Sequence, residues 1–301
     1  MAIILRSLGN PGLALGAAAA LLLICPLPGF AAPTCTAASG PRTVPLVELY
    51  TSEGCNSCPP ADRWLSSSFA PGAATAGAIP LAFHVDYWDR LGWKDRFAAP
   101  AWTERQYAAA HATRSNLVYT PQVLVQGRDF RDWRTAGKSK AAIAAAGARP
   151  ARANIMLEAT PRQGAVAVKA TAHVPGGADR KNTALFVALA DSGLVSEVKA
   201  GENAGARLSH DHVVRALHGG LRVDANGDIG GDVVLPLPAE AGTATTVVAF
   251  VQNSETGEVL QALALPLAQP ACTPGVYAVT LNDRPPTNAK LATIRLGARQ
   301  P

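Results

Sequence analysis

The sequence predicts an α/β domain followed by an all-β, sandwich-like domain. Between residues 44 and 148, apolar runs with strand character alternate with segments of helix-forming composition. From residue 155 onward, short alternating apolar runs are separated by turn-forming clusters. The first pattern is typical of a small sheet with helices packed on it, and the second of a sandwich. A chain of 301 residues with 48% apolar content is long enough for two such domains.

The predicted α/β domain spans residues 44–148. Strands are expected at 44–50, 79–85 and 120–125, and helices at 61–69, 99–115 and 138–148. The middle helix has Trp102, Gln106 and Ala110 on one face. The last helix is predicted from its alanine content.

The predicted β domain spans residues 153–268. Strands are expected at 165–170, 184–189, 245–252 and 259–265, with turns such as 175–177 and 255–257 between them. Residues 269–301 are predicted to be an irregular C-terminal tail.

The first 31 residues are predicted to be an export signal. Arg6 supplies the positive charge, residues 13–24 the apolar stretch, and residues 29–31 small side chains for cleavage. Ile24 is too bulky a neighbour to favour lipid attachment at Cys25. No later segment is long and apolar enough to span a bilayer, so we expect a periplasmic or secreted protein without a membrane span after signal removal.

The charge balance is modest. Lys and Arg total 27 and Asp and Glu 22, and removal of Arg6 with the signal gives 26 − 22 = +4. No run of consecutive basic residues accompanies this charge, so nucleic acid is not an expected partner.

Four cysteines remain after signal removal, and an even number favours pairing in an oxidising compartment. Three connectivities are possible. The close spacing of Cys55 and Cys58 favours that pair, which leaves Cys35 to form a structural disulfide with Cys272.

Cys55-Asn56-Ser57-Cys58 lies at a predicted strand-to-helix turn, which is the geometry of a dithiol redox centre. Unpaired N–H groups at a helix start favour negative charge, so a sulfur placed there ionises more easily. The thiolate is the attacking species in thiol–disulfide exchange. The motif therefore predicts Cys55 as an exposed nucleophile and Cys58 as the resolving thiol.

Residues 44–148 resemble the thioredoxin superfamily, and residues 50–61 are most similar to glutaredoxin-like sequences. Thr120-Pro121 falls where that superfamily keeps its cis-proline loop opposite the dithiol. The resemblance implies that Pro121 shields the disulfide and that Thr120 and Pro121 contact an extended partner peptide.

Nearly all of the mature chain resembles the DUF1223 family of exported bacterial proteins. The segments that carry this resemblance are 55–62, 84–95, 201–203 and 210–215. The function implied for that family rests on its fold, so the resemblance adds little about activity.

The dithiol segment departs from the usual thioredoxin pattern. Glu53 places a negative charge near the sulfur atoms, which opposes thiolate formation. Pro59 and Pro60 remove two N–H groups directly after Cys58. We therefore expect the helix to begin later than in thioredoxin and to support the Cys55 sulfur less.

Two further groups of residues have competing interpretations. Asp86 and Trp88, after the second strand, are candidates for lining a partner groove, with Asp86 as a proton relay to Cys58; the alternative is that the aromatic residues pack the loop. His210 and His212 share one face of a strand, but without a cysteine or glutamate ligand nearby we assign no metal site.

The leading functional hypothesis is an exported thiol–disulfide oxidoreductase that needs no dissociable cofactor. Its expected partners are cysteine-containing exported proteins and a redox partner protein. The alternatives are Cu(I) binding by the two thiolates, a non-enzymatic envelope binding module, and a purely structural Cys55–Cys58 disulfide.

Overall fold

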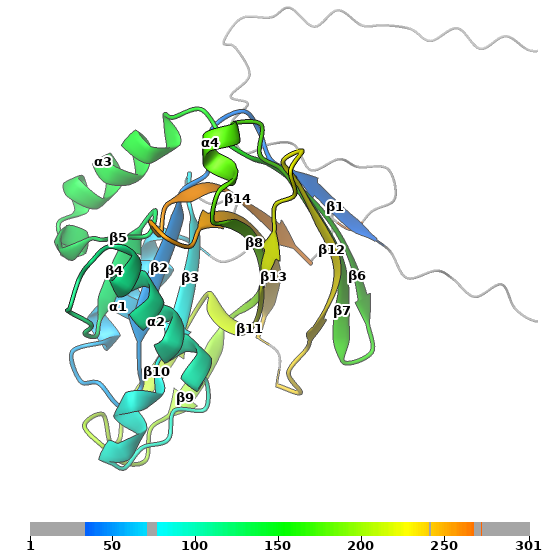
Figure 1. Ribbon diagram of the computed structural model, residues 1–301. Helices are drawn as coiled ribbons and strands as arrows, with labels where there is room; N and C mark the ends of the chain where they lie inside the picture. The colour runs from blue at the N-terminus through cyan, green and yellow to red at the C-terminus, as the bar shows by residue number, and fades with distance from the viewer. Residues whose placement is uncertain (1–33, 71–76, 241, 268–271, 273–301) are drawn as a thin grey trace, which may run out of the picture. The chain divides into compact units, whose positions relative to one another are not determined.

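Two β-sheets form most of the fold in the computed structural model (Figure 1). The structure describes residues 34–70, 77–240, 242–267 and 272. The predicted signal at 1–31, and all of the predicted tail except Cys272, lie outside these residues. In the described part of the chain, no helix has the length and apolar character needed to cross a membrane.

The larger sheet has eight strands in the order β14-β13-β8-β11-β3-β2-β4-β5. These strands are β2 (Leu46–Thr51), β3 (Ile79–His84), β4 (Gln122–Val125), β5 (Arg128–Asp129), β8 (Thr183–Ser192), β11 (Val213–Arg222), β13 (Ala244–Asn253) and β14 (Val259–Pro266). The β2–β3 and β3–β11 pairs are parallel, and the other pairs are antiparallel.

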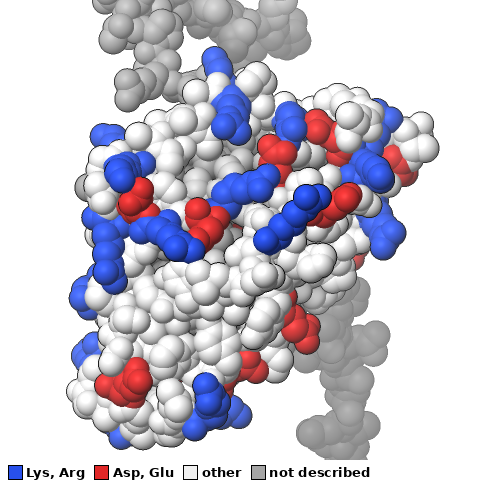
Figure 2. Space-filling model, turned by 60° about the vertical axis from the view of Figure 1, so that its left-hand side comes forward, with Lys and Arg blue, Asp and Glu red and all other residues white. Residues whose placement is uncertain are grey.

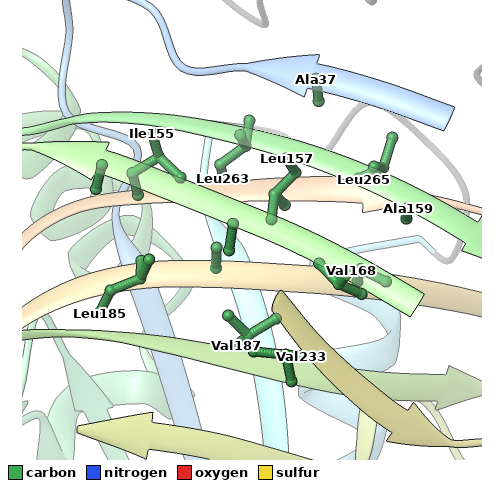
Figure 3. Close-up of a cluster of buried hydrophobic side chains, with 14 of the residues drawn as sticks. Ala37, Ile155, Leu157, Ala159, Val168, Leu185, Val187, Val233, Leu263 and Leu265 are labelled. Carbon is green, nitrogen blue, oxygen red and sulfur yellow. The ribbon is translucent and has the colours of Figure 1, made fainter. Parts of the chain in front are cut away.

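The smaller sheet is antiparallel, in the order β1-β6-β7-β12. Its strands are β1 (Cys35–Ala38), β6 (Asn154–Arg162), β7 (Ala165–His173) and β12 (Asp228–Pro236). Strand β6 alternates exposed and buried residues along most of its length, as a sheet with one solvated face requires. Its buried side chains, such as Leu157, meet Val187 and Leu265 of the larger sheet (Figure 3).

Helices cover both faces of the β2–β3–β4 region. Helix α1 (Pro59–Ser68) and helix α3 (Ala136–Gly147) pack on one face, where Leu65 and Ile143 join the same apolar cluster as Val47. Helix α2 (Pro100–Ala112) packs on the other face. Its buried residues are Trp102, Gln106 and Ala110, the three that the sequence places on one face.

Five short elements complete the description. The 3-10 helices η1 (Asp86–Leu91) and η2 (Arg131–Arg134) and the one-turn helix α4 (Gly177–Arg180) lie between larger elements. Strands β9 (Leu194–Glu197) and β10 (Arg207–His210) form a separate two-stranded sheet at the lower end of Figure 1. Residues 198–206 connect them, and we call this segment the β9–β10 loop.

The predicted fold class, an α/β thioredoxin-like domain followed by a β-sandwich, is wrong. The chain is mostly β, and strands from both predicted regions belong to one continuous sheet. Val213 of β11 pairs with Ala82 of β3, which joins the C-terminal strands to the N-terminal ones. Local periodicity identifies a strand but not its hydrogen-bonding neighbour, and therefore cannot reveal this junction. The boundary predicted near residue 150 stays a prediction.

Charged side chains of both signs are interspersed on the face shown in Figure 2. Several of them form exposed ion pairs, such as Lys138 with Asp132 and Arg207 with Glu197. Exposed pairs of this kind contribute little to stability because water and salt screen them.

Candidate functional site

The turn between β2 and α1 holds the Cys55–Cys58 disulfide. Cys58 is the N-cap of α1, and Pro59 and Pro60 occupy the first two helical positions. The helix therefore begins directly after Cys58. That it begins later than in thioredoxin, and supports the Cys55 sulfur less, stays a prediction. Proline fits here because the first helical N–H groups lack partners within the helix. The cysteines lie at the N-terminal, positive end of the helix dipole. This position favours the thiolate form of a cysteine.

Both cysteines of this disulfide are fully buried, with an exposed fraction of 0%. Cys55, which we expected to be exposed, is therefore buried in the disulfide-bonded state that the structure shows. The dithiol turn, residues 53–58, is contacted instead by the β9–β10 loop.

Two side chains of that loop cap the backbone of the dithiol turn. The amide nitrogen of Asn203 donates to the carbonyl oxygens of Glu53, at 2.8 Å, and of Cys55, at 3.0 Å. The backbone N–H of Asn56 donates to a carboxylate oxygen of Glu202 at 3.2 Å. Three polar backbone groups around the first cysteine are therefore satisfied by residues almost 150 positions later in the chain.

The Thr120–Pro121 peptide bond is cis, and Trp88 connects this loop to the dithiol turn. The indole N–H of Trp88 donates to the Thr120 hydroxyl at 2.8 Å. A Cβ built on Gly54 would lie 3.1 Å from the Trp88 Cβ, so glycine permits this close approach. Trp88 therefore contacts both the dithiol turn and the cis-proline loop. The partner contacts predicted for Trp88, Thr120 and Pro121 stay predictions.

An open cavity of about 370 Å³ is lined by residues of both the dithiol turn and the cis-proline loop. Its lining comprises Ser57, Leu117, Tyr119, Pro121, Arg131, Trp133 and Arg134. Ser57 lies between the two cysteines, so the cavity reaches the dithiol turn itself.

The hydrogen bonds of Asp86 join it to Thr103 of α2, not to the dithiol turn. Its carboxylate accepts a hydrogen bond of 2.5 Å from the Thr103 hydroxyl. The backbone N–H of Asp86 donates to the oxygen of that hydroxyl at 3.2 Å. These bonds attach the start of η1 to α2. The relay role predicted for Asp86 stays a prediction.

A set of buried ionisable side chains lies around the start of α1. We call it the buried acid–imidazole cluster; its members are Glu53, Asp62, His84, Asp95 and His210. Each has an exposed fraction below 9%. They come from the dithiol turn, α1, the end of β3, the segment after η1, and β10.

Asp95 connects the cluster to the dithiol turn. One carboxylate oxygen lies 2.7 Å from His84 Nδ1 and accepts the backbone N–H of Glu53 at 2.9 Å. The other accepts the N–H of Phe97 at 2.9 Å. Burial alone would raise the pKa of Asp95, but the neighbouring His84 outweighs it and lowers that pKa.

The His84 side of this pair shows the complementary shift. Burial would lower the pKa of His84, but the attraction of Asp95 outweighs burial and raises it. A raised imidazole pKa beside a lowered carboxyl pKa describes a buried ion pair. Such pairs are costly to break because one charge is left without a partner.

Glu53 is held on its other side by His210 and Trp93. The indole N–H of Trp93 donates to one carboxylate oxygen at 2.7 Å. His210 Nε2 lies 3.2 Å from the other oxygen but is not aligned for a hydrogen bond. Burial raises the pKa of Glu53, but the contact with His210 and the bond from Trp93 outweigh it, so that the pKa is lowered.

Asp62 behaves differently from the other two acids. Burial dominates and raises its pKa, despite the opposing charges of His210 and His84. Asp62 lies one helical turn after Cys58, and its backbone N–H donates to the Cys58 carbonyl at 3.2 Å. Of the three carboxyl groups in the cluster, that of Asp62 therefore retains its proton most readily.

From the sequence, Glu53 was expected only to oppose thiolate formation, and His210 was considered only as a metal ligand. Asp62, His84, Asp95, Glu202 and Asn203 were given no functional role. The signal that was available is the set of segments 55–62, 84–95, 201–203 and 210–215, which carry the family resemblance. The structure brings all four together around the disulfide.

His210 and His212 do not act as a pair. His210 faces Glu53, whereas His212 Nε2 lies 2.6 Å from the carbonyl oxygen of Phe69. Across the described ranges, no group of three or more His, Cys, Asp or Glu side chains has an arrangement suited to a metal ion.

Comparison with protein families matches residues 46–252 to the family described as "Protein of unknown function (DUF1223)". The chain belongs to the DUF1223 family. The match includes the dithiol turn, the buried acid–imidazole cluster and the β9–β10 loop. The DUF1223 family and the Cys55–Cys58 disulfide are together compatible with a redox role.

Two solved structures are similar to this DUF1223 chain. A protein from Agrobacterium tumefaciens, known from its crystal structure, has 25% identity and a TM-score of 0.50, covering 75% of this chain and 96% of that one. HBP35 of Porphyromonas gingivalis has 14% identity and a TM-score of 0.54, covering 85% of this chain and 81% of that one. The second likeness shows the fold alone. No curated protein matches the chain.

Proposed function

We propose that this protein is a thiol–disulfide oxidoreductase that uses Cys55 and Cys58. In the reducing direction, the Cys55 thiolate attacks a partner disulfide and releases one partner sulfur as a thiolate. The Cys58 thiolate then attacks the mixed disulfide, which re-forms the Cys55–Cys58 bond and releases the second partner thiolate. Run backwards, the same steps oxidise a partner dithiol. The two electrons stay within the exchanging sulfur atoms.

The observation that carries this proposal is the buried acid–imidazole cluster beside a helix-terminal disulfide. Burying five ionisable groups is costly, and strongly perturbed groups of this kind concentrate at functional sites. Opening the disulfide in its buried setting also creates sulfur charge that needs a proton or a counter-charge. Asp62, one turn after Cys58, and the imidazole of His84 both have raised pKa values and can hold and exchange protons.

A purely structural role explains the Cys55–Cys58 disulfide poorly. Its sequence separation is 3, against 237 for Cys35–Cys272. In the chain-entropy account, the stabilisation grows with the logarithm of loop length, so the short bridge contributes roughly 2 kcal/mol and the long one roughly 5. A bridge between two residues only three positions apart restricts the unfolded chain little.

The proposed partners follow from the sequence prediction of export. They are cysteine-containing exported proteins, with a redox partner protein that restores the starting state of the dithiol. Thr120, Pro121 and Trp88 are the proposed contacts for the partner, because the cavity lined by Pro121 reaches Ser57 of the dithiol turn.

The test is exchange with a disulfide-bonded model protein, measured with Cys55→Ser and Cys58→Ser variants. We expect Cys55→Ser to abolish exchange and Cys58→Ser to accumulate a mixed disulfide that mass spectrometry detects. The double variant Cys35→Ser/Cys272→Ser is the matched control and keeps its exchange rate. Full activity of Cys55→Ser would contradict the proposal.

A further inference from the structure

The disulfide that the proposed function needs is buried in the folded chain. Cys55 and Cys58 are both 0% exposed, whereas an attacking thiolate must reach a sulfur atom along the S–S axis. Exchange therefore requires that some covering segment moves. The positions of the contacts identify which one.

The β9–β10 loop is joined to the dithiol turn by side chains that are themselves exposed or half-buried. Its strands pair only with each other and join neither of the two larger sheets. Three hydrogen bonds from Glu202 and Asn203 attach the loop to the dithiol turn. Glu202 is exposed and Asn203 half-buried, so water can replace these bonds when the loop lifts.

The contacts are specific rather than a general covering. Asn203 donates to the carbonyl oxygens on both sides of Gly54, namely those of Glu53 and Cys55. Gly201 has a φ of +74°, and a Cβ there would lie 3.1 Å from the Trp93 Cβ. Trp93 in turn donates to Glu53. The loop is thus shaped to fit against the dithiol turn.

We infer that the β9–β10 loop is a gate over the Cys55–Cys58 disulfide, held closed by Asn203, and that it determines which thiols reach Cys55. This inference rests on the proposed function. A partner that reaches Cys55 replaces Asn203 as the donor to the two carbonyl groups, and an extended peptide segment offers backbone N–H groups for this purpose. Small thiols react only during spontaneous opening of the loop.

The gate is tested with dithiothreitol, a small dithiol, as the attacking reagent. One of its thiolates attacks Cys55, and the Cys55–Cys58 bond breaks with Cys58 leaving as a thiolate that takes up a proton. The second thiolate then displaces Cys55 from the mixed disulfide and closes the oxidised reagent ring. Alkylation at timed intervals and peptide mass spectrometry give the reduction rate of each disulfide separately.

We expect Asn203→Ala to accelerate reduction of Cys55–Cys58 by about tenfold or more, because two hydrogen bonds that hold the loop are lost. Lys199→Ala is the matched control; this exposed side chain lies in the same loop and has no described contact with the dithiol turn. Its rate should equal that of the unmodified protein.

The buried Cys35–Cys272 disulfide serves as an internal reference in each sample. If Asn203→Ala accelerates both disulfides equally, the substitution has loosened the whole fold and the gate is overturned. An unchanged Cys55–Cys58 rate overturns it as well. Neither result depends on exchange with a protein partner, so failure of the gate is distinct from failure of the proposed function.

Discussion

Asp95 is the residue on which the buried acid–imidazole cluster depends most. Its two carboxylate oxygens serve three groups: the imidazole of His84 and the backbone N–H groups of Glu53 and Phe97. The Glu53 bond fixes the start of the dithiol turn, and the His84 contact fixes the end of β3. A single side chain therefore sets both the charge balance of the cluster and the position of the backbone before Cys55.

Asp95→Asn is expected to lower the free energy of unfolding by about 3 kcal/mol, because the buried His84 loses its counter-charge. Urea denaturation near pH 6 measures the change. Asp132→Asn is the control, since Asp132 forms only an exposed pair with Lys138, and it should change stability by less than about 1 kcal/mol. Equal effects of the two substitutions would contradict the assigned role.

The pH dependence of this effect follows from the two pKa shifts. The pKa of His84 is raised above 6.5, so its contribution is complete below that value and is lost as the pH rises through the folded-state pKa. The pKa of Asp95 is lowered below 3.8, so its contribution is complete above that value and is lost as the pH falls through the folded-state pKa.

The stability difference between the unmodified protein and Asp95→Asn is therefore expected to be largest between about pH 4 and about pH 6.5 and to narrow on either side. Denaturation curves recorded across this range check it. A difference that does not vary with pH would show that Asp95 acts through shape alone.

At the level of elements, two tight turns from opposite edges of the larger sheet are in contact. The turn between β4 and β5 contains Gly127, with a φ of +74°. It packs against Gly257 in the turn between β13 and β14: a Cβ on Gly127 would lie 1.9 Å from the Gly257 carbonyl oxygen. These turns come from the two regions that the sequence assigns to separate domains, and only glycine permits their contact.

Gly127→Ala is expected to destabilise the fold by about 3 kcal/mol, through backbone strain and the clash with Gly257. Gly164→Ala is a matched control, because Gly164 has a similar φ of +69° but no atom within 4 Å of the added Cβ. It should cost only about 1 kcal/mol, the penalty of the left-handed conformation. Thermal unfolding of both variants measures the difference, and equal losses would exclude a role for the turn contact.

At the scale of the whole molecule, the Cys35–Cys272 disulfide joins the first strand of the smaller sheet to a residue beyond the last strand of the larger one. Both cysteines belong to the apolar cluster between the two sheets. The bond therefore closes nearly the entire described chain into one loop.

Cys35→Ser/Cys272→Ser is expected to lower the free energy of unfolding by roughly 3–5 kcal/mol, since a long loop is released in the unfolded chain. Denaturant unfolding of the oxidised proteins measures it. Cys55→Ser/Cys58→Ser is the comparison and should cost less, because that loop is short. The reverse order would assign the structural role to the dithiol turn.

Features that depend on neighbouring residues could be predicted from the sequence. The Cys55–Cys58 spacing, the helix after it, the shared face of Trp102, Gln106 and Ala110, and several strands follow from motif and periodicity, which are local properties. Family membership follows from segments spread along the chain, and the comparison with families confirms it. Exported location and partners stay predictions.

Which strands become neighbours, and which distant side chains are in contact, depends on the tertiary structure. The Val213–Ala82 pairing merges two predicted regions into one sheet, and no local pattern specifies it. His210 and Asn203 reach the dithiol turn only because the β9–β10 strands project from the segment between β8 and β11. Hydrogen bonds and burial depend on distance in space, so the gate and the buried acid–imidazole cluster are visible only after the chain is folded.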